Sequence, residues 1–209
     1  MKPAWTVSFS ILLIILIADS ARAMLVDRIL AVVNRQPITL SDFNRYQAFL
    51  ALNDGKKNWE LSPSPSPAVL QQLIDRKLLL EEAEKFEVGL PKSADLLEAQ
   101  DRLAKRFTNV LEFQNTLLRW GLDRDALQHE IQDYLTIQRF VEQRITFFVI
   151  IPPAEIQKYY ETHREEFKEK RLEEALAHIT KQLTDLKARE KLDAYLKKLR
   201  EKASIQINL

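Results

Sequence analysis

Side chains that could carry out catalysis or bind a metal are few in this sequence. The chain has three histidines, three glycines and no cysteine. His129, Glu130 and Asp133 come nearest to a metal site, because residues three and four apart share one face of a helix. A zinc-binding protease helix needs a second histidine at that spacing, where this chain has Asp133. We therefore predict a solvated helix face here and no metal site.

The other common catalytic arrangements also find no support. Without cysteine, nucleophilic catalysis would need a serine or threonine beside a histidine and a carboxylate, and no serine lies in a recognisable strained turn. Phosphate-binding loops and dinucleotide sites need clustered glycines, whereas the three glycines here are Gly55, Gly89 and Gly121. The sequence thus predicts no catalytic residue and no cofactor.

The first 23 residues have the three parts of a secretory signal peptide. Lys2 gives the positive start, residues 7–18 are almost unbroken apolar, and Ala21-Arg22-Ala23 has the small-x-small pattern of a cleavage site. The apolar run is far shorter than the roughly 20 residues of a bilayer span. We predict cleavage after Ala23, export, and no stable membrane span afterwards. The alternative is an uncleaved membrane anchor.

The predicted exported chain carries no net charge. Removing Lys2, Arg22 and Asp19 leaves 29 basic and 29 acidic residues. A nucleic-acid-binding domain would show a basic excess or stripe, so we predict no nucleic-acid partner. An exported protein without disulfides depends on core packing for its stability.

The order of predicted elements indicates a mainly helical fold with a strand region at each end. Residues 28–33 are apolar and β-branched, residues 34–37 suit a turn, and residues 38–40 suit a second short strand. Residues 204–209 alternate strictly and predict a half-buried strand. A lone short strand is unstable, so we expect residues 205–209 to pair with residues 28–33 and to make residues 24–209 one domain. Helices are expected to begin at or just after Ser41, Pro67, Ser93, Asn109, Asp123 and Pro152.

Two segments stand out within this plan. Residues 53–67 end in alternating serine and proline and predict an exposed, stiff loop that contains Trp59. Residues 170–202 lack glycine and proline and predict a helix of roughly 50 Å. Its apolar seam follows heptad spacing from Leu172 to Leu186 and then changes phase at Leu192, which indicates two packing partners or a bend.

This order of elements resembles the SurA-type periplasmic chaperones, specifically their non-catalytic N-terminal domain with its C-terminal helix and strand. The similar segments are residues 27–34 and 38–43 (first strand and helix start), 73–83 (second helix), 113–131 (the following helix pair), 153–160 (the helix before the isomerase domain) and 192–207 (closing helix and strand). The resemblance implies a helical bundle or cradle with a small terminal sheet, of the trigger factor/SurA peptide-binding type.

The chain departs from that family where a parvulin prolyl isomerase domain would follow Phe167. Here residues 168–171 run straight into the last long helix, and no glycine follows Pro153. Parvulins need several glycines and an active-site histidine set, so we predict that the isomerase domain is absent and that the chain is not an enzyme. Pro152 also stands where the family usually has a capping serine or threonine.

The resemblance implies a holdase that binds unfolded exported polypeptides, in particular precursors of outer-membrane β-barrels. Candidate client-binding residues are Phe43, Tyr46, Phe49, Trp59, Phe147 and Phe148, although core packing is the default interpretation of each. Trp59 and the Phe147-Phe148 pair have the better claim, because they lie in a polar loop and beside a proline break. A second hypothesis is an assembly protein that self-associates through residues 170–202, as a homodimer that exchanges this helix. Prolyl isomerase activity is the third and least supported.

Overall fold

The computed structural model describes residues 27–56, 59–61, 64–167 and 171–208. The predicted signal peptide and its cleavage position after Ala23 lie outside these residues. Among the helices described, none is both long and apolar enough to cross a membrane.

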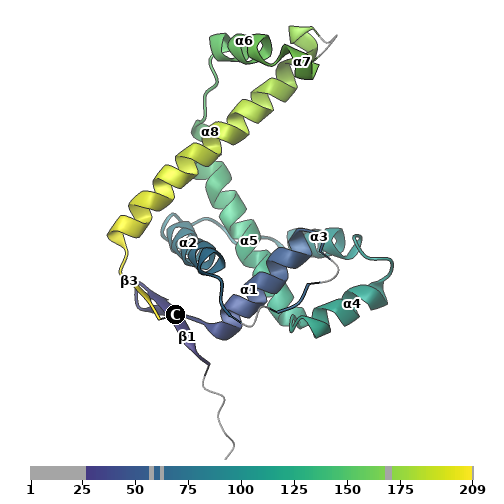
Figure 1. Cartoon of the computed structure of the whole chain (residues 1–209), viewed down its shortest axis with the longest axis vertical. Coiled ribbons are helices and arrows are strands. Elements are labelled where there is room, and N and C mark those ends of the chain that lie inside the picture. The colour runs from purple at the N-terminus through teal and green to yellow at the C-terminus, as the bar shows by residue number, and fades with distance from the viewer. Residues whose placement is uncertain (1–26, 57–58, 62–63, 168–170, 209) are drawn as a thin grey trace, which may run out of the picture.

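The sheet has three antiparallel strands, and its pairing joins the two ends of the described chain (Figure 1). β1 (Ile29–Val33) and β2 (Gln36–Thr39) form a hairpin, and β3 (Ile205–Ile207) pairs with the other side of β1. The predicted pairing of the terminal strands is confirmed. The predicted four-residue turn is wrong, because Asn34 and Arg35 alone make it with φ of 47° and 72°, the left-handed backbone of a two-residue hairpin turn.

The first helix, α1 (Leu40–Asn53), begins earlier than expected. Thr39 rather than Ser41 is its cap: the Thr39 Oγ1 accepts the Asp42 N–H at 3.2 Å, and the Asp42 carboxylate accepts the Thr39 N–H at 2.9 Å. This reciprocal capping box satisfies two backbone donors at once, whereas the Ser41 N–H donates to Asp27 at 3.1 Å.

The remaining helices form a body and an arm. α2 (Pro67–Lys85), α3 (Ser93–Ala104), α4 (Val110–Arg119) and α5 (Arg124–Arg144) surround α1. After a short 3-10 turn, η1 (Thr146–Phe148), the chain forms α6 (Pro153–Thr162) and α7 (Arg164–Phe167), which lie away from the body. The long α8 (Leu172–Lys202) runs from these two helices back to β3 (Figure 1). The predicted fold class, mainly helical with a small terminal sheet, is confirmed.

The two halves of α8 pack against different partners, as the phase change of its apolar seam predicts. Ala175, Ile179 and Leu183 are buried in a small core with α6 and α7. Further along, Leu196 is buried against α2 and α5. Each half therefore turns a different face inward.

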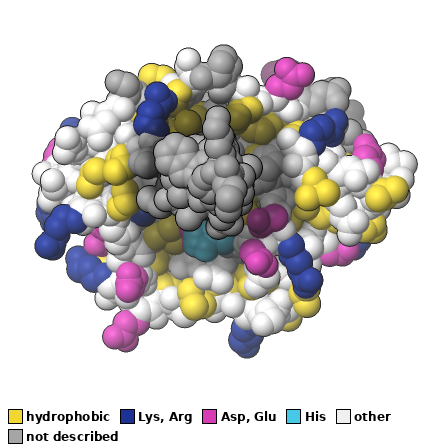
Figure 2. Space-filling model, turned by 90° about the horizontal axis from the view of Figure 1, so that it is seen from below, with side chains coloured by type: hydrophobic (Ala, Val, Ile, Leu, Met, Phe, Trp, Pro, Cys, Tyr) yellow, Lys and Arg dark blue, Asp and Glu magenta, His cyan; other side chains and the backbone are white. Residues whose placement is uncertain are grey.

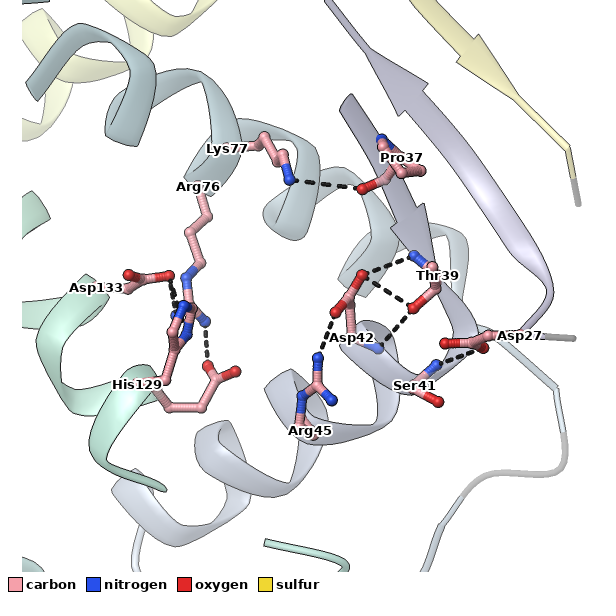
Figure 3. A network of polar contacts seen from close by, with 11 residues as sticks. Asp27, Pro37, Thr39, Ser41, Asp42, Arg45, Arg76, Lys77, His129 and Asp133 are labelled. Atoms are coloured by element: carbon pink, nitrogen blue, oxygen red, sulfur yellow. Dashed lines mark hydrogen bonds and ion pairs between the residues drawn. The ribbon is translucent and has the colours of Figure 1, made fainter. Parts of the chain in front are cut away.

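A buried ion-pair network connects α2 and α5 (Figure 3). The Arg76 guanidinium is buried; it forms an ion pair with Glu130, donates to Asp133 at 2.9 Å and lies 5.0 Å from the centre of the Tyr46 ring. Burial opposes the charged form, but the two carboxylates outweigh it, so the pKa of Arg76 is raised above its ordinary value. The predicted solvated face is therefore wrong for Glu130 and Asp133, whereas His129 is exposed beside them.

We expect Arg76→Ala to lower the free energy of unfolding by about 3–5 kcal/mol, because two carboxylates would stay buried without their cation. Arg102 is the matched control, since it pairs with Glu98 on an exposed surface, and Arg102→Ala should cost less than about 1 kcal/mol. Urea unfolding measures both. Equal losses would show that the buried network contributes no more than a surface ion pair.

Candidate functional site

Two of the predicted client-binding residues belong to the core. Phe43 is 1% exposed and packs between α1, α2 and the sheet. Phe49 is also buried and packs with residues of α3, α4 and α5. For these side chains the structure favours the core alternative that periodicity alone left open.

Tyr46 borders an apolar hollow of about 300 Å³ between α1, α2, α5 and α8. One edge of the buried Phe49 ring reaches this hollow, where it meets Tyr134 edge-on with ring centres 5.8 Å apart. Tyr46 is half-buried, and this burial raises the pKa of its phenol. The other apolar lining comes from Leu50, Leu79, Ile137 and Leu196. This hollow can accept a single aliphatic or aromatic side chain.

Trp59 lies at a larger hollow, of about 820 Å³, beside the start of α1 and the turn between α4 and α5. Its ring meets Trp120 edge-on, with centres 5.4 Å apart and planes at 73°. Asn44, Arg45 and Arg119 are among the polar residues of the lining. Sequence reasoning missed Trp120, whose only local signal is an aromatic residue directly before the helix-ending Gly121. The combination suits a side chain against the indoles and a backbone along the polar rim.

Phe147 and Phe148 are the most exposed of the predicted residues, at 77% and 57%, and Ile150 is 81% exposed. Their rings contact each other edge-on with centres 5.3 Å apart. The Lys191 ammonium of α8 donates to the Phe148 carbonyl at 2.8 Å and holds this segment in place. We call Phe147, Phe148 and Ile150 the aromatic knuckle; Ile150 was not among the predicted site residues.

The knuckle projects because its neighbours are anchored in two different cores. Ile145 is buried at the end of α5, and Ile151 packs against the arm core of α6, α7 and α8. Between these anchors the side chains of Phe147, Phe148 and Ile150 stay exposed. Exposed apolar clusters of this kind mark interaction sites more often than single exposed residues do.

Charged side chains are mixed on the part of the surface that the described residues form in Figure 2. Basic and acidic groups lie near one another there, with hydrophobic side chains between them. No cluster of three possible metal ligands occurs among the residues that the structure describes. The candidate sites described above are thus lined by apolar or by mixed apolar and polar side chains.

The sequence of this chain is similar to those of known chaperones. No protein-family model matches the chain. It is 27% identical over 155 residues to a chaperone SurA of Alkalilimnicola ehrlichii, covering 73% of this chain and 36% of that protein. It is 29% identical over 153 residues to a chaperone SurA of Alcanivorax borkumensis, covering 70% and 34%. The match thus spans about a third of these relatives' length, and the predicted resemblance is confirmed.

A solved structure is also similar. It comes from work on PEB4 and Cj1289, two SurA-like chaperones of Campylobacter jejuni, and matches with a TM-score of 0.41 and 17% identity over 68% of this chain and 52% of that chain.

We expect the double substitution Phe147→Ser and Phe148→Ser to change the free energy of unfolding by less than about 1 kcal/mol, because both side chains are largely exposed. Phe43→Ala should cost about 3–5 kcal/mol through the cavity it leaves. Chemical unfolding compares the two. A large loss in the double variant would place the knuckle in the core.

Proposed function

We propose that residues 24–209 form a single periplasmic chaperone domain that holds unfolded exported polypeptides, with outer-membrane β-barrel precursors as clients, and that it has no prolyl isomerase activity. The exposed aromatic knuckle carries this proposal. Similarity to SurA chaperones supports a chaperone in general, and the predicted signal peptide supports export. In the chain, α7 ends at Phe167 and α8 begins at Leu172, which leaves no length for a parvulin domain between them.

The energetics of the knuckle suit a holdase. Burying one large apolar side chain contributes about 1.5–3 kcal/mol, and ordering the client opposes binding. Three such side chains therefore support weak binding that reverses without an energy source. A client with exposed apolar residues is covered transiently and then released.

The Trp59–Trp120 hollow supplies a second contact of the same kind. Stacked or edge-on aromatic contacts add about 0.5–1.5 kcal/mol beyond simple burial. Its polar rim includes Asn44 and Arg119, which can donate to carbonyl groups of an extended chain. Such a site selects for the shape and apolar character of a side chain and does not require one client sequence.

We expect the exported chain to suppress aggregation when a urea-unfolded outer-membrane β-barrel protein is diluted from denaturant, as light scattering measures. Phe147→Ser with Phe148→Ser should remove most of this suppression, because the largest exposed aromatic contact is lost. Val110 and Leu118 on α4 are similarly exposed, so their double serine variant is the matched control and should retain it.

No suppression by the unaltered chain at several-fold molar excess would contradict the proposed function. Equal loss in both double variants would show that any exposed apolar residue serves, and would remove the special role of the knuckle.

The assembly alternative draws on two exposed leucines of α8, Leu176 and Leu186. The central residues of the same seam, Ile179 and Leu183, are already buried against α6 and α7 of the same chain, which favours a closed monomer. We expect light scattering coupled to gel filtration to give the monomer mass across concentrations. A stable dimer would favour the helix-exchange hypothesis.

A further inference from the structure

We propose that the outer edge of β3 is a second kind of binding site, which takes an extended client strand through backbone hydrogen bonds. The inference rests on the proposed function for its occupant, an unfolded polypeptide. It adds a different mode of recognition. A strand edge binds the backbone of a client through hydrogen bonds, whereas the knuckle contacts client side chains.

The register shows which backbone groups of β3 are free to bind. Val32 lies opposite Gln206, the Asn34 N–H donates to the Ser204 carbonyl at 2.9 Å, and the Asn208 N–H donates to the Leu30 carbonyl at 2.8 Å. Gln206 of β3 and its flanking residues Ser204 and Asn208 therefore direct their backbone groups toward β1. Since successive residues of a strand point their backbone groups to opposite sides, the N–H and C=O groups of Ile205 and Ile207 point outward.

The opposite edge of the same sheet is closed. On β2, Pro37 has no N–H, and its carbonyl accepts the Lys77 ammonium at 3.5 Å (Figure 3). The Thr39 N–H is taken by the Asp42 carboxylate. Proline and lysine are among the residues that proteins use to block edge strands. Here Pro37 lies on β2 itself, and Lys77 reaches it from α2.

β3 carries no such protection among its described residues. Its sequence is Ile-Gln-Ile, without proline, lysine or a bulge in its pairing with β1. The outward backbone groups of Ile205 and Ile207 take part in no hydrogen bond within the described chain. As far as the described residues go, one edge of the sheet is thus blocked and the other is open.

The side chains beside the open edge select an alternating apolar strand. Ile205 and Ile207 lie opposite Val33 and Ala31, which are buried, so all four share the core-facing side of the sheet. Ile205 is half-buried there, whereas Ile207 is 51% exposed. A fourth strand with every second residue apolar would cover Ile207 and extend this face. Strands of a β-barrel have this alternation.

A second copy of this chain is the less suitable occupant. β3 is only three residues long, and specific stable interfaces bury about 1,200–2,000 Å². Edge-to-edge pairing of two such strands would bury far less. A longer, flexible client strand suits a site that binds weakly and releases.

The test uses residues 24–209 and a ten-residue peptide. Valine and threonine alternate along this peptide between two terminal lysines. We expect this peptide to protect the Ile205 and Ile207 amides from hydrogen exchange, as NMR measures. The same peptide with all central amides N-methylated should bind at least about fivefold more weakly, because it cannot donate to the edge.

Two variants separate backbone from side-chain recognition. Ile207→Pro removes one outward N–H and leaves the ladder residues Gln206 and Asn208 unchanged, so it should weaken peptide binding by about five- to tenfold. Ile207→Thr keeps the N–H and should weaken binding by about two- to threefold at most. Protection of the Gln206 amide in each variant checks that β3 still pairs with β1.

Equal binding of the two peptides, or protection confined to Phe147 and Phe148, would overturn the edge site and leave the proposed function intact. Protection of Ile205 and Ile207 without peptide, with a doubled mass, would assign the edge to a second copy. Failure of the proposed function is distinguishable, since the unaltered chain would then also fail to suppress aggregation.

Discussion

The pairing of β1 with β3 is the constraint on which the arrangement of the other elements depends. It joins residues far apart in sequence, and Asn34 reinforces it by accepting the Ser204 N–H at 3.0 Å and donating to Glu81 at 2.6 Å. One turn earlier, Arg200 of α8 binds both carboxylate oxygens of Asp75 on α2, at 2.6 and 3.0 Å. These contacts fix the C-terminal half of α8 on the body, so its other half must extend away from it.

The extended half of α8 explains both the arm and the exposed knuckle. A helix that leaves the body exposes its apolar seam unless another element covers it. In this chain α6 and α7 cover the seam of α8. The chain must therefore pass from the end of α5 to the arm, and the segment between them lies outside both cores. Phe147, Phe148 and Ile150 are exposed because of this passage, and Lys191 fixes the segment to the same helix.

Local pattern predicted much of the fold, and what it missed depends on partners distant in sequence. Strict alternation at residues 204–209 predicted a terminal strand, and the phase change at Leu192 predicted two partners for α8. The burial of Glu130 could not be predicted, because its cation Arg76 lies on another helix. Periodicity alone likewise could not distinguish the buried Phe43 from the exposed Phe147, since an apolar residue looks the same in sequence whether or not a neighbour covers it; only the proline break after Phe148 favoured the second as a site candidate.

The two proposed recognition modes strengthen each other because α8 connects them. From Lys191 beside the knuckle to Lys202 before β3, the helix rises about 17 Å, a length that roughly five or six extended residues span. One client segment of about ten residues is long enough to reach both. The knuckle is attached to α8 through Lys191 and β3 directly follows α8, so the first weak contact raises the effective concentration of the second. The client can then be held firmly overall and still leave by breaking one weak contact at a time.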